Sequence, residues 1–156
     1  MNWTTLIKYL PILKEAGMIG LQMIRLRLAN ISAGTVMTIQ EAEKVIKKEC
    51  NKYTLLDAEY HLIPKDSIKT VFNVNLAKYL KYRAEAFDCD DFARTAGVLI
   101  RLAFGNVSVG DAIVSYDNGS RHMLNIVITK DKEVVYVEPQ NNSVVPKTFK
   151  VEEIRL

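Results

Sequence analysis

The chain has 156 residues, of which 49% are hydrophobic and 25% charged, and this is the composition of an ordinary globular domain. Its net charge of +3 is too small, and its basic residues too dispersed, to indicate a nucleic-acid-binding protein. No stretch is apolar enough to span a bilayer, and the two cysteines favour a reduced, cytoplasmic protein over a disulfide-stabilised one.

The first expected element is an N-terminal helical arm over residues 1–36, set apart from a folded domain over residues 37–156. Leucine, isoleucine and methionine recur in the arm at helical spacing, with Pro11 as a probable break. Such a segment more often packs against protein than against lipid. We therefore expect that a protein partner, rather than a membrane, is what the arm would contact.

A second helix is predicted to begin at Thr38, because Thr38 and Glu41 form the pattern of a capping box before an apolar periodic run. Cys50 lies near the end of that helix, where a free cysteine is more often packed than reactive. His61 lies beside apolar residues in a short extended segment and is interpreted as structural. Residues 65–82 are expected to form one or two short helices.

The strongest helix signal covers residues 87–105. Asp88 suits the N-cap position, Asp91 follows three residues later, and Gly105 suits the end of the helix. Cys89 therefore opens the helix, where the positive end of the helix dipole can lower the pKa of a thiol. The acidic residues around it act in the opposite direction, because negative charge raises that pKa.

After residue 105 the hydrophobic period changes from helical to alternating, which indicates an antiparallel β-meander. Strands are expected over residues 107–116, 121–129 and 134–138, with turns at 117–119 and 130–132 and a final short element over 144–156. Helices followed by such a meander are typical of an α+β fold.

His122 and Glu138 lie near the ends of neighbouring predicted strands. A loop centred on Lys130 would place His122 opposite Glu138, on the sheet face that we expect to pack against the cysteine helix. The other register would bring Gln140, or the residue after it, near His122 instead. Cys89 as nucleophile, His122 as base and Glu138 as orienting group would then form a thiol-dependent catalytic triad.

The segments FDCDDFA, RHMLNIVI and VVYVEPQNN resemble the core of the transglutaminase-like cysteine proteinases, within the wider papain-like superfamily. This resemblance covers residues 87–142 and implies an α+β core in which the helix that opens with Cys89 packs on the meander. The implied catalytic residues are Cys89, His122 and Glu138. Asp88 and Asn125 are expected to support the substrate or the catalytic groups, and Gln140 joins them through the alternative register.

The function expected from the resemblance is a thiol-dependent hydrolase, acting as a peptidase or amidase, or an acyltransferase. Either would act on a peptide or amide-containing substrate through an acyl-enzyme intermediate, so the residues do not distinguish hydrolysis from transfer. The alternative is a catalytically inactive binding module on the same transglutaminase-like fold. No cofactor is expected, and no metal site is predicted, because side chains adjacent in one helical turn point apart.

Overall fold

The computed structural model describes residues 14, 17, 18, 20 and 35–156. The expected helical arm over residues 1–36 therefore lies almost entirely outside the described residues. None of the helices in the described part is long and apolar enough to cross a membrane.

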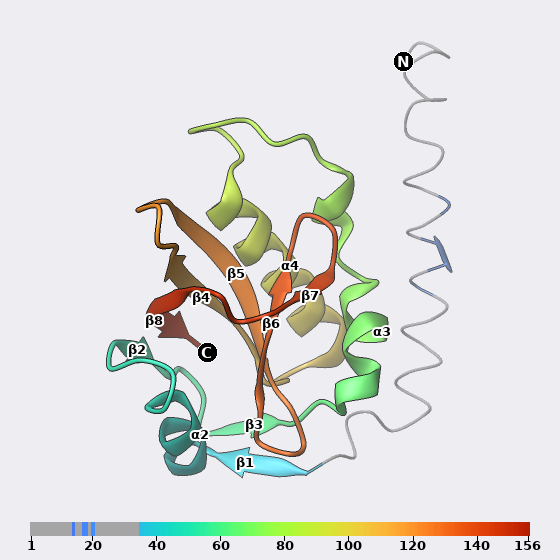
Figure 1. The fold of residues 1–156 in the computed structure, drawn as a ribbon. Coiled ribbons are helices and arrows are strands. Elements are labelled where there is room, and N and C mark those ends of the chain that lie inside the picture. The colour runs from blue at the N-terminus through green and yellow to red at the C-terminus, as the bar shows by residue number, and fades with distance from the viewer. Residues whose placement is uncertain (1–13, 15–16, 19, 21–34) are drawn as a thin grey trace.

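Beyond residue 34 the structure contains eight strands, three α-helices and two short 3-10 helices (Figure 1). In chain order they are β1 (Val36–Thr38), α2 (Ile39–Ile46), β2 (Tyr53–Thr54), β3 (Glu59–His61), a 3-10 helix (Lys65–Ser67), α3 (Ile68–Phe72), a 3-10 helix (Leu76–Tyr79), α4 (Cys89–Phe104), β4 (Val109–Ser115), β5 (Arg121–Ile128), β6 (Val134–Glu138), β7 (Ser143–Val145) and β8 (Lys150–Arg155). Within this part α4 is the one long helix, and the strands form the framework on which it packs.

A six-stranded sheet with the order β2-β8-β4-β5-β6-β7 forms the centre of the fold. Strands β4 to β7 follow one another as an antiparallel meander, as the alternating pattern predicts. The last strand, β8, lies beside β4 and pairs in parallel with β2, and both pairings join segments far apart in the chain. The first part of the domain is less helical than predicted, because β1 and β3 form a separate two-stranded sheet there.

Each face of the central sheet carries its own apolar cluster. On one face Leu124 and Ile126 of β5 pack with residues of β1, α2 and β3. On the other face Val127 of β5 packs with Ile100 of α4. Because side chains alternate along a strand, His122 belongs to the face of Leu124 and Ile126. The prediction that this face packs against the cysteine helix is therefore wrong, since α4 covers the opposite one.

The turn between β5 and β6 sets the register of these two strands. The loop is centred on Asp131, not on Lys130 as predicted, and Lys132 closes it in the left-handed conformation with a φ of 60°. This register is shifted by two residues from the one that sets His122 directly opposite Glu138. A shift of two residues keeps both side chains on the same face, so they remain diagonal neighbours.

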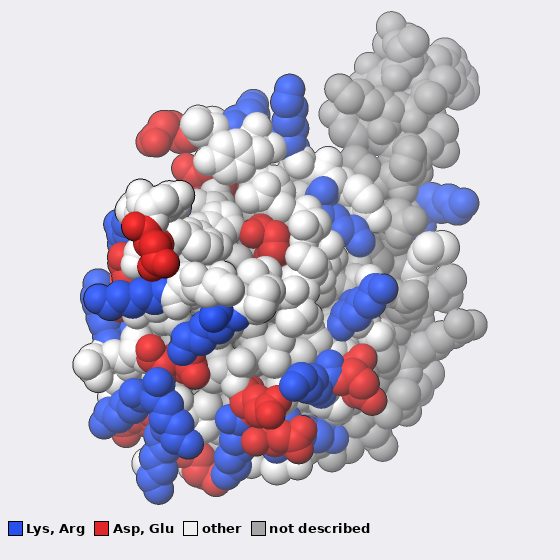
Figure 2. Space-filling view, viewed as in Figure 1, with Lys and Arg blue, Asp and Glu red and all other residues white. Residues whose placement is uncertain are grey.

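Helix α2 begins with the capping box that the sequence predicts. The Thr38 hydroxyl accepts a hydrogen bond from the Glu41 backbone N–H at 3.4 Å, and the Thr38 N–H donates to Glu41 Oε2 at 3.0 Å. A hydrogen bond from Lys132 Nζ to Glu41 Oε1, 2.9 Å long, is the main reason that the pKa of Glu41 falls to about 2. On the lower part of the face in Figure 2, basic and acidic side chains interleave in this way.

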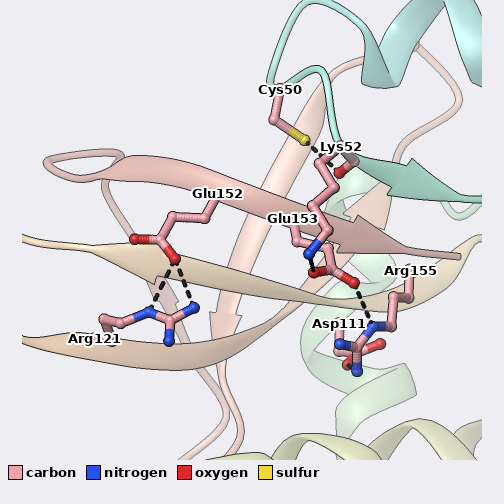
Figure 3. Close-up of polar contacts among 7 residues, drawn as sticks. All are labelled: Cys50, Lys52, Asp111, Arg121, Glu152, Glu153 and Arg155. Carbon is pink, nitrogen blue, oxygen red and sulfur yellow. Dashed lines mark hydrogen bonds and ion pairs between the residues drawn. The ribbon is translucent and has the colours of Figure 1, made fainter.

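A network of charged side chains runs along β8 at its border with β4 (Figure 3). Arg155 Nε donates to Glu153 Oε1 at 2.9 Å, and Lys52 pairs with the same carboxylate. Arg155 Nη1 lies 3.8 Å from Asp111 Oδ2. Burial raises the pKa of the Asp111 carboxyl, and the positive charge of Arg155 only partly opposes this rise.

We expect an Asp111→Asn substitution to change how stability depends on pH. A carboxyl group whose pKa is raised on folding binds more protons in the native state, so its favourable contribution is complete at acid pH and is lost as pH rises through the raised pKa. The unfolding free energy of the variant should therefore improve relative to wild type between about pH 4 and pH 7. Urea denaturation at a series of pH values measures this difference, and a constant difference would contradict the prediction.

Candidate functional site

The site begins at the first turn of α4, which has the cap that the sequence predicts. Asp88 Oδ1 accepts from the Asp90 backbone N–H at 3.3 Å, and the Asp88 N–H donates to Asp91 Oδ2 at 3.2 Å. At the other end Gly105 has a φ of 79°, a conformation that favours glycine. These two ends fix Cys89 as the first residue of the helix, with its side chain half-buried.

Removing this cap should destabilise the domain measurably. We expect Asp88→Ala to lower the unfolding free energy by about 1 kcal/mol, because the first-turn N–H groups lose their acceptor. Asp88→Asn is the matched control, since its side-chain oxygen can still accept. Thermal unfolding of the two variants at pH 7 should separate them, and equal melting temperatures would contradict a capping role.

Three carboxylates crowd the same turn. Oxygen atoms of Asp88, Asp90 and Asp91 lie within 4.8 Å of one another, which makes them the group among the described residues that could hold a metal ion. A hydrogen bond with the Asp90 side chain lowers the pKa of Asp88, and the same contact raises the pKa of Asp90. Arg94 Nη1, at 2.5 Å from Asp90 Oδ2, supplies positive charge to the cluster. Acidic first turns are common without an ion because the helix dipole favours them.

His122 and Glu138 meet at the end of the meander. His122 Nε2 lies 2.7 Å from Glu138 Oε2, and the two side chains are 21% and 18% exposed. The other oxygen, Oε1, accepts the Gln140 backbone N–H at 3.1 Å. Glu138 is thereby held in place, and its contact with Nε2 leaves Nδ1 as the other polar atom of the ring.

Cys89 and His122 line one pocket of about 270 Å³ between the start of α4 and the sheet. Its remaining lining residues are Asp90, Arg94, Ile113, Arg121, Met123 and Arg155. Across residues 35–156 no hydrogen bond joins Cys89 Sγ to His122, so the structure brings the acid and the imidazole together and leaves the thiol as their neighbour in the pocket.

Asn125 has a structural part in this arrangement. Its side chain is fully buried, and its Nδ2 donates to the Ala93 carbonyl at 2.9 Å and to the Gly110 carbonyl at 3.1 Å. Asn125 thus joins the second turn of α4 to β4 and sets the distance of the helix from the sheet. The role expected for it beside the catalytic groups is supported only indirectly, through the position of the helix.

The remaining cysteine and histidine lie away from the pocket. Cys50 Sγ donates to the Lys52 carbonyl at 3.2 Å, and burial raises the pKa of this thiol (Figure 3). His61 forms part of β3, where it pairs with Val36. Both cysteines are free, and a cytoplasmic location stays a prediction.

Sequence reasoning missed the arginines and apolar residues that complete the pocket. Arg121 and Met123 flank His122 in the chain, and Arg155 comes from the last strand. The first two had a usable signal, because neighbours of a strand residue lie close to it at a sheet end. Arg155 had none, since the pairing of β8 with β4 is set by tertiary structure.

Comparison with known families gives one match over most of the chain. The model of the family described as "Ricin-type beta-trefoil lectin C-terminal domain" matches residues 32–150. Among curated proteins, none matches the chain.

Solved structures similar to the chain are lectin structures. One, titled "PSL1a-E64 complex", has a TM-score of 0.68 and 20% identity, over 78% of this chain and 51% of that one. Another is Polyporus squamosus lectin bound to the human-type influenza-binding epitope Neu5Aca2-6Galb1-4GlcNAc, with a TM-score of 0.65 and 20% identity, over 78% of this chain and 49% of that one. The chain therefore spans about half the length of these structures.

These findings correct the identification made from short motifs. The matched family and the similar structures are those of lectins, so the membership in the transglutaminase-like or papain-like group is overturned. The fold is the strand-based one with few helices that these lectin structures share, in place of the expected papain-like α+β core. A cysteine opening a helix, followed by a histidine and an acid on strands, is too short a pattern to fix a family.

The functional expectation changes with the family. A thiol-dependent hydrolase or acyltransferase is not what the matches indicate, and neither is an inactive module on a transglutaminase-like fold. The titles of the two structures name a glycan and E64, and neither names a peptide or amide substrate.

Proposed function

Because the chain belongs to the family of ricin-type β-trefoil lectin C-terminal domains, we propose that it is a domain of a carbohydrate-binding lectin. The proposed ligand site is the pocket at the N-terminal end of α4, which Cys89 and His122 line. The observation that carries this choice is the convergence of a thiol, an imidazole–carboxylate pair and a carboxylate cluster on one opening.

The chemistry of the pocket suits a saccharide. Sugar hydroxyl groups need several hydrogen-bond donors and acceptors beside an apolar surface. Asp90 supplies acceptors and Arg94 supplies donors, while Ile113 and Met123 offer apolar contact. An occupant with both hydroxyl groups and C–H surface would use all of these groups at once.

An exposed aromatic ring lies close to the same turn. Tyr82 is 49% exposed, and burial of its hydroxyl end, together with the negative charges of Asp88 and Cys89, raises its pKa. The phenol therefore stays neutral at pH 7, where it can donate a hydrogen bond while its ring faces a ligand. This ring extends the proposed site beyond the pocket itself.

A titration with the trisaccharide named for the similar structure, Neu5Aca2-6Galb1-4GlcNAc, tests the proposal. We expect amide resonances of the first turn of α4 and of the start of β5 to shift in nuclear magnetic resonance spectra, and the shifts to weaken in a Tyr82→Ala variant. Leu80→Ala, another half-exposed position on the same loop, is the matched control. Shifts confined to residues far from α4 would contradict the proposed site.

We also propose that Cys89 is the reactive group of this site, with His122 as its proton acceptor and Glu138 as the group that orients the ring. The support is the 2.7 Å contact between His122 and Glu138 and the pocket that His122 shares with Cys89. A similar structure is titled as a complex with E64, an epoxide that thiols open. The substitutions and the labelling that test this part are described in the Discussion.

A further inference from the structure

A second cleft lies between α4 and the strands β4 and β8, next to the pocket described above. It has a volume of about 200 Å³, and Arg94 and Arg155 form the wall that the two share. Gly97 faces this cleft from α4, and a Cβ atom added there would meet nothing within 4 Å. The space is therefore open along the helix, in contrast to the close packing of the sheet.

The floor of the cleft presents two acceptors that lack donors. Asn125 is fully buried, and its Oδ1 has no hydrogen-bond partner, although its Nδ2 is bonded twice. Asp111 pairs with Asn125 across β4 and β5, so both side chains lie on the face of the sheet that α4 covers. Its carboxylate has only the 3.8 Å contact with Arg155 Nη1 shown in Figure 3. A buried acceptor without a donor costs free energy, which a ligand that donates can recover.

The rim of the cleft is apolar and its charges are already paired. Leu56 and Val98 border it with side chains that are 70% and 58% exposed. Arg94 pairs with Asp90 at 2.5 Å, and Arg101 of the same helix donates to the Val109 carbonyl at 3.2 Å. The arginines thus surround the opening without offering a vacant pair to an anion.

We propose that this cleft binds a neutral aromatic ring that carries one hydrogen-bond donor, such as indole or phenol. The volume suits one ring system, since an apolar cavity of about 150 Å³ accepts benzene. The acceptors of Asp111 and Asn125 repel a carboxylate, and the arginines at the rim disfavour an ammonium group. The faces of Leu56 and Val98 cover the ring, while its N–H or O–H meets the floor. This inference is independent of the proposed lectin site.

A matched pair of ligands tests the inference on the full chain. Indole should shift the amide resonances of Gly97 and Gly110, and 1-methylindole, which lacks the N–H, should bind about tenfold more weakly. Benzoate and benzylammonium should bind more weakly than phenol. Equal binding of indole and 1-methylindole, or shifts confined to residues outside the cleft, would overturn the proposal. So would the absence of binding by any ring, which would leave a bound water as the occupant.

A variant that fills the space provides the second test. Gly97→Leu should remove indole binding, and thermal unfolding should show that the variant is folded, because leucine favours a helix over glycine. Gly97→Ala adds one methyl group and should keep weaker binding. Undiminished binding of indole to a folded Gly97→Leu protein would place the ligand elsewhere and contradict the inference.

Discussion

An alanine at Gly110 is expected to lower the unfolding free energy by more than about 3 kcal/mol, or to prevent folding. A Cβ atom at this position would lie 2.0 Å from the Arg155 carbonyl oxygen and 3.0 Å from Leu156 Cα. Both are backbone atoms, so no rotation of a side chain relieves the overlap. Strand β8 would have to move away from β4, and the hydrogen bond from Asn125 to the Gly110 carbonyl would be strained with it.

The control is the same substitution at another glycine. Gly97→Ala, in the middle of α4, meets no atom within 4 Å and should raise stability by up to about 1 kcal/mol, because alanine is the better helix former. Urea denaturation of both variants measures the contrast. A Gly110→Ala protein as stable as wild type would show that β8 does not lie against β4 as described.

Replacing His122 with alanine should slow the alkylation of Cys89 by iodoacetamide at least about tenfold at pH 7, if the imidazole accepts the thiol proton. Glu138→Gln should slow it less, because the amide oxygen can still accept a hydrogen bond from the ring at the 2.7 Å contact. The rate is measured by peptide mass spectrometry over a time course.

Cys50 supplies the internal reference for this experiment. Its thiol lies outside the pocket and bonds to the Lys52 carbonyl, so its alkylation rate should be the same in wild type and in both variants. A His122→Ala protein in which Cys89 reacts at the wild-type rate would contradict the proposed role of the ring. Equal slowing at both cysteines would point to a change in folding instead.

Elements defined by local chemistry were predictable from the sequence. The capping residues Thr38 and Asp88 fixed the starts of α2 and α4, because an N-cap acts through neighbours three residues away. Strand β6 was found with its bounds, Val134–Glu138, because β-branched residues and a turn signal frame it. The acid–imidazole contact was also within reach, since alternation places His122 and Glu138 on one face in either of two registers.

What depends on distant parts of the chain could not be read in this way. The pairing of β8 with β4 joins segments separated by a whole meander, and no local pattern records it. The left-handed conformation of Lys132 shifted the register by two residues, although a lysine gives no signal for it. The face that α4 covers was misassigned because both faces of β5 are apolar, and alternation alone does not say which one a helix takes.

Labelling with E64 tests most directly whether the pocket at the start of α4 is the ligand site of this domain. We predict one adduct per chain in intact mass spectra, located on Cys89 by peptide mapping and absent from a Cys89→Ser variant. The thiolate sulfur would attack an epoxide carbon, the carbon–oxygen bond would break, and the oxygen would take up a proton. Labelling of Cys50 in preference to Cys89, or a folded protein that forms no adduct at all, would contradict the account.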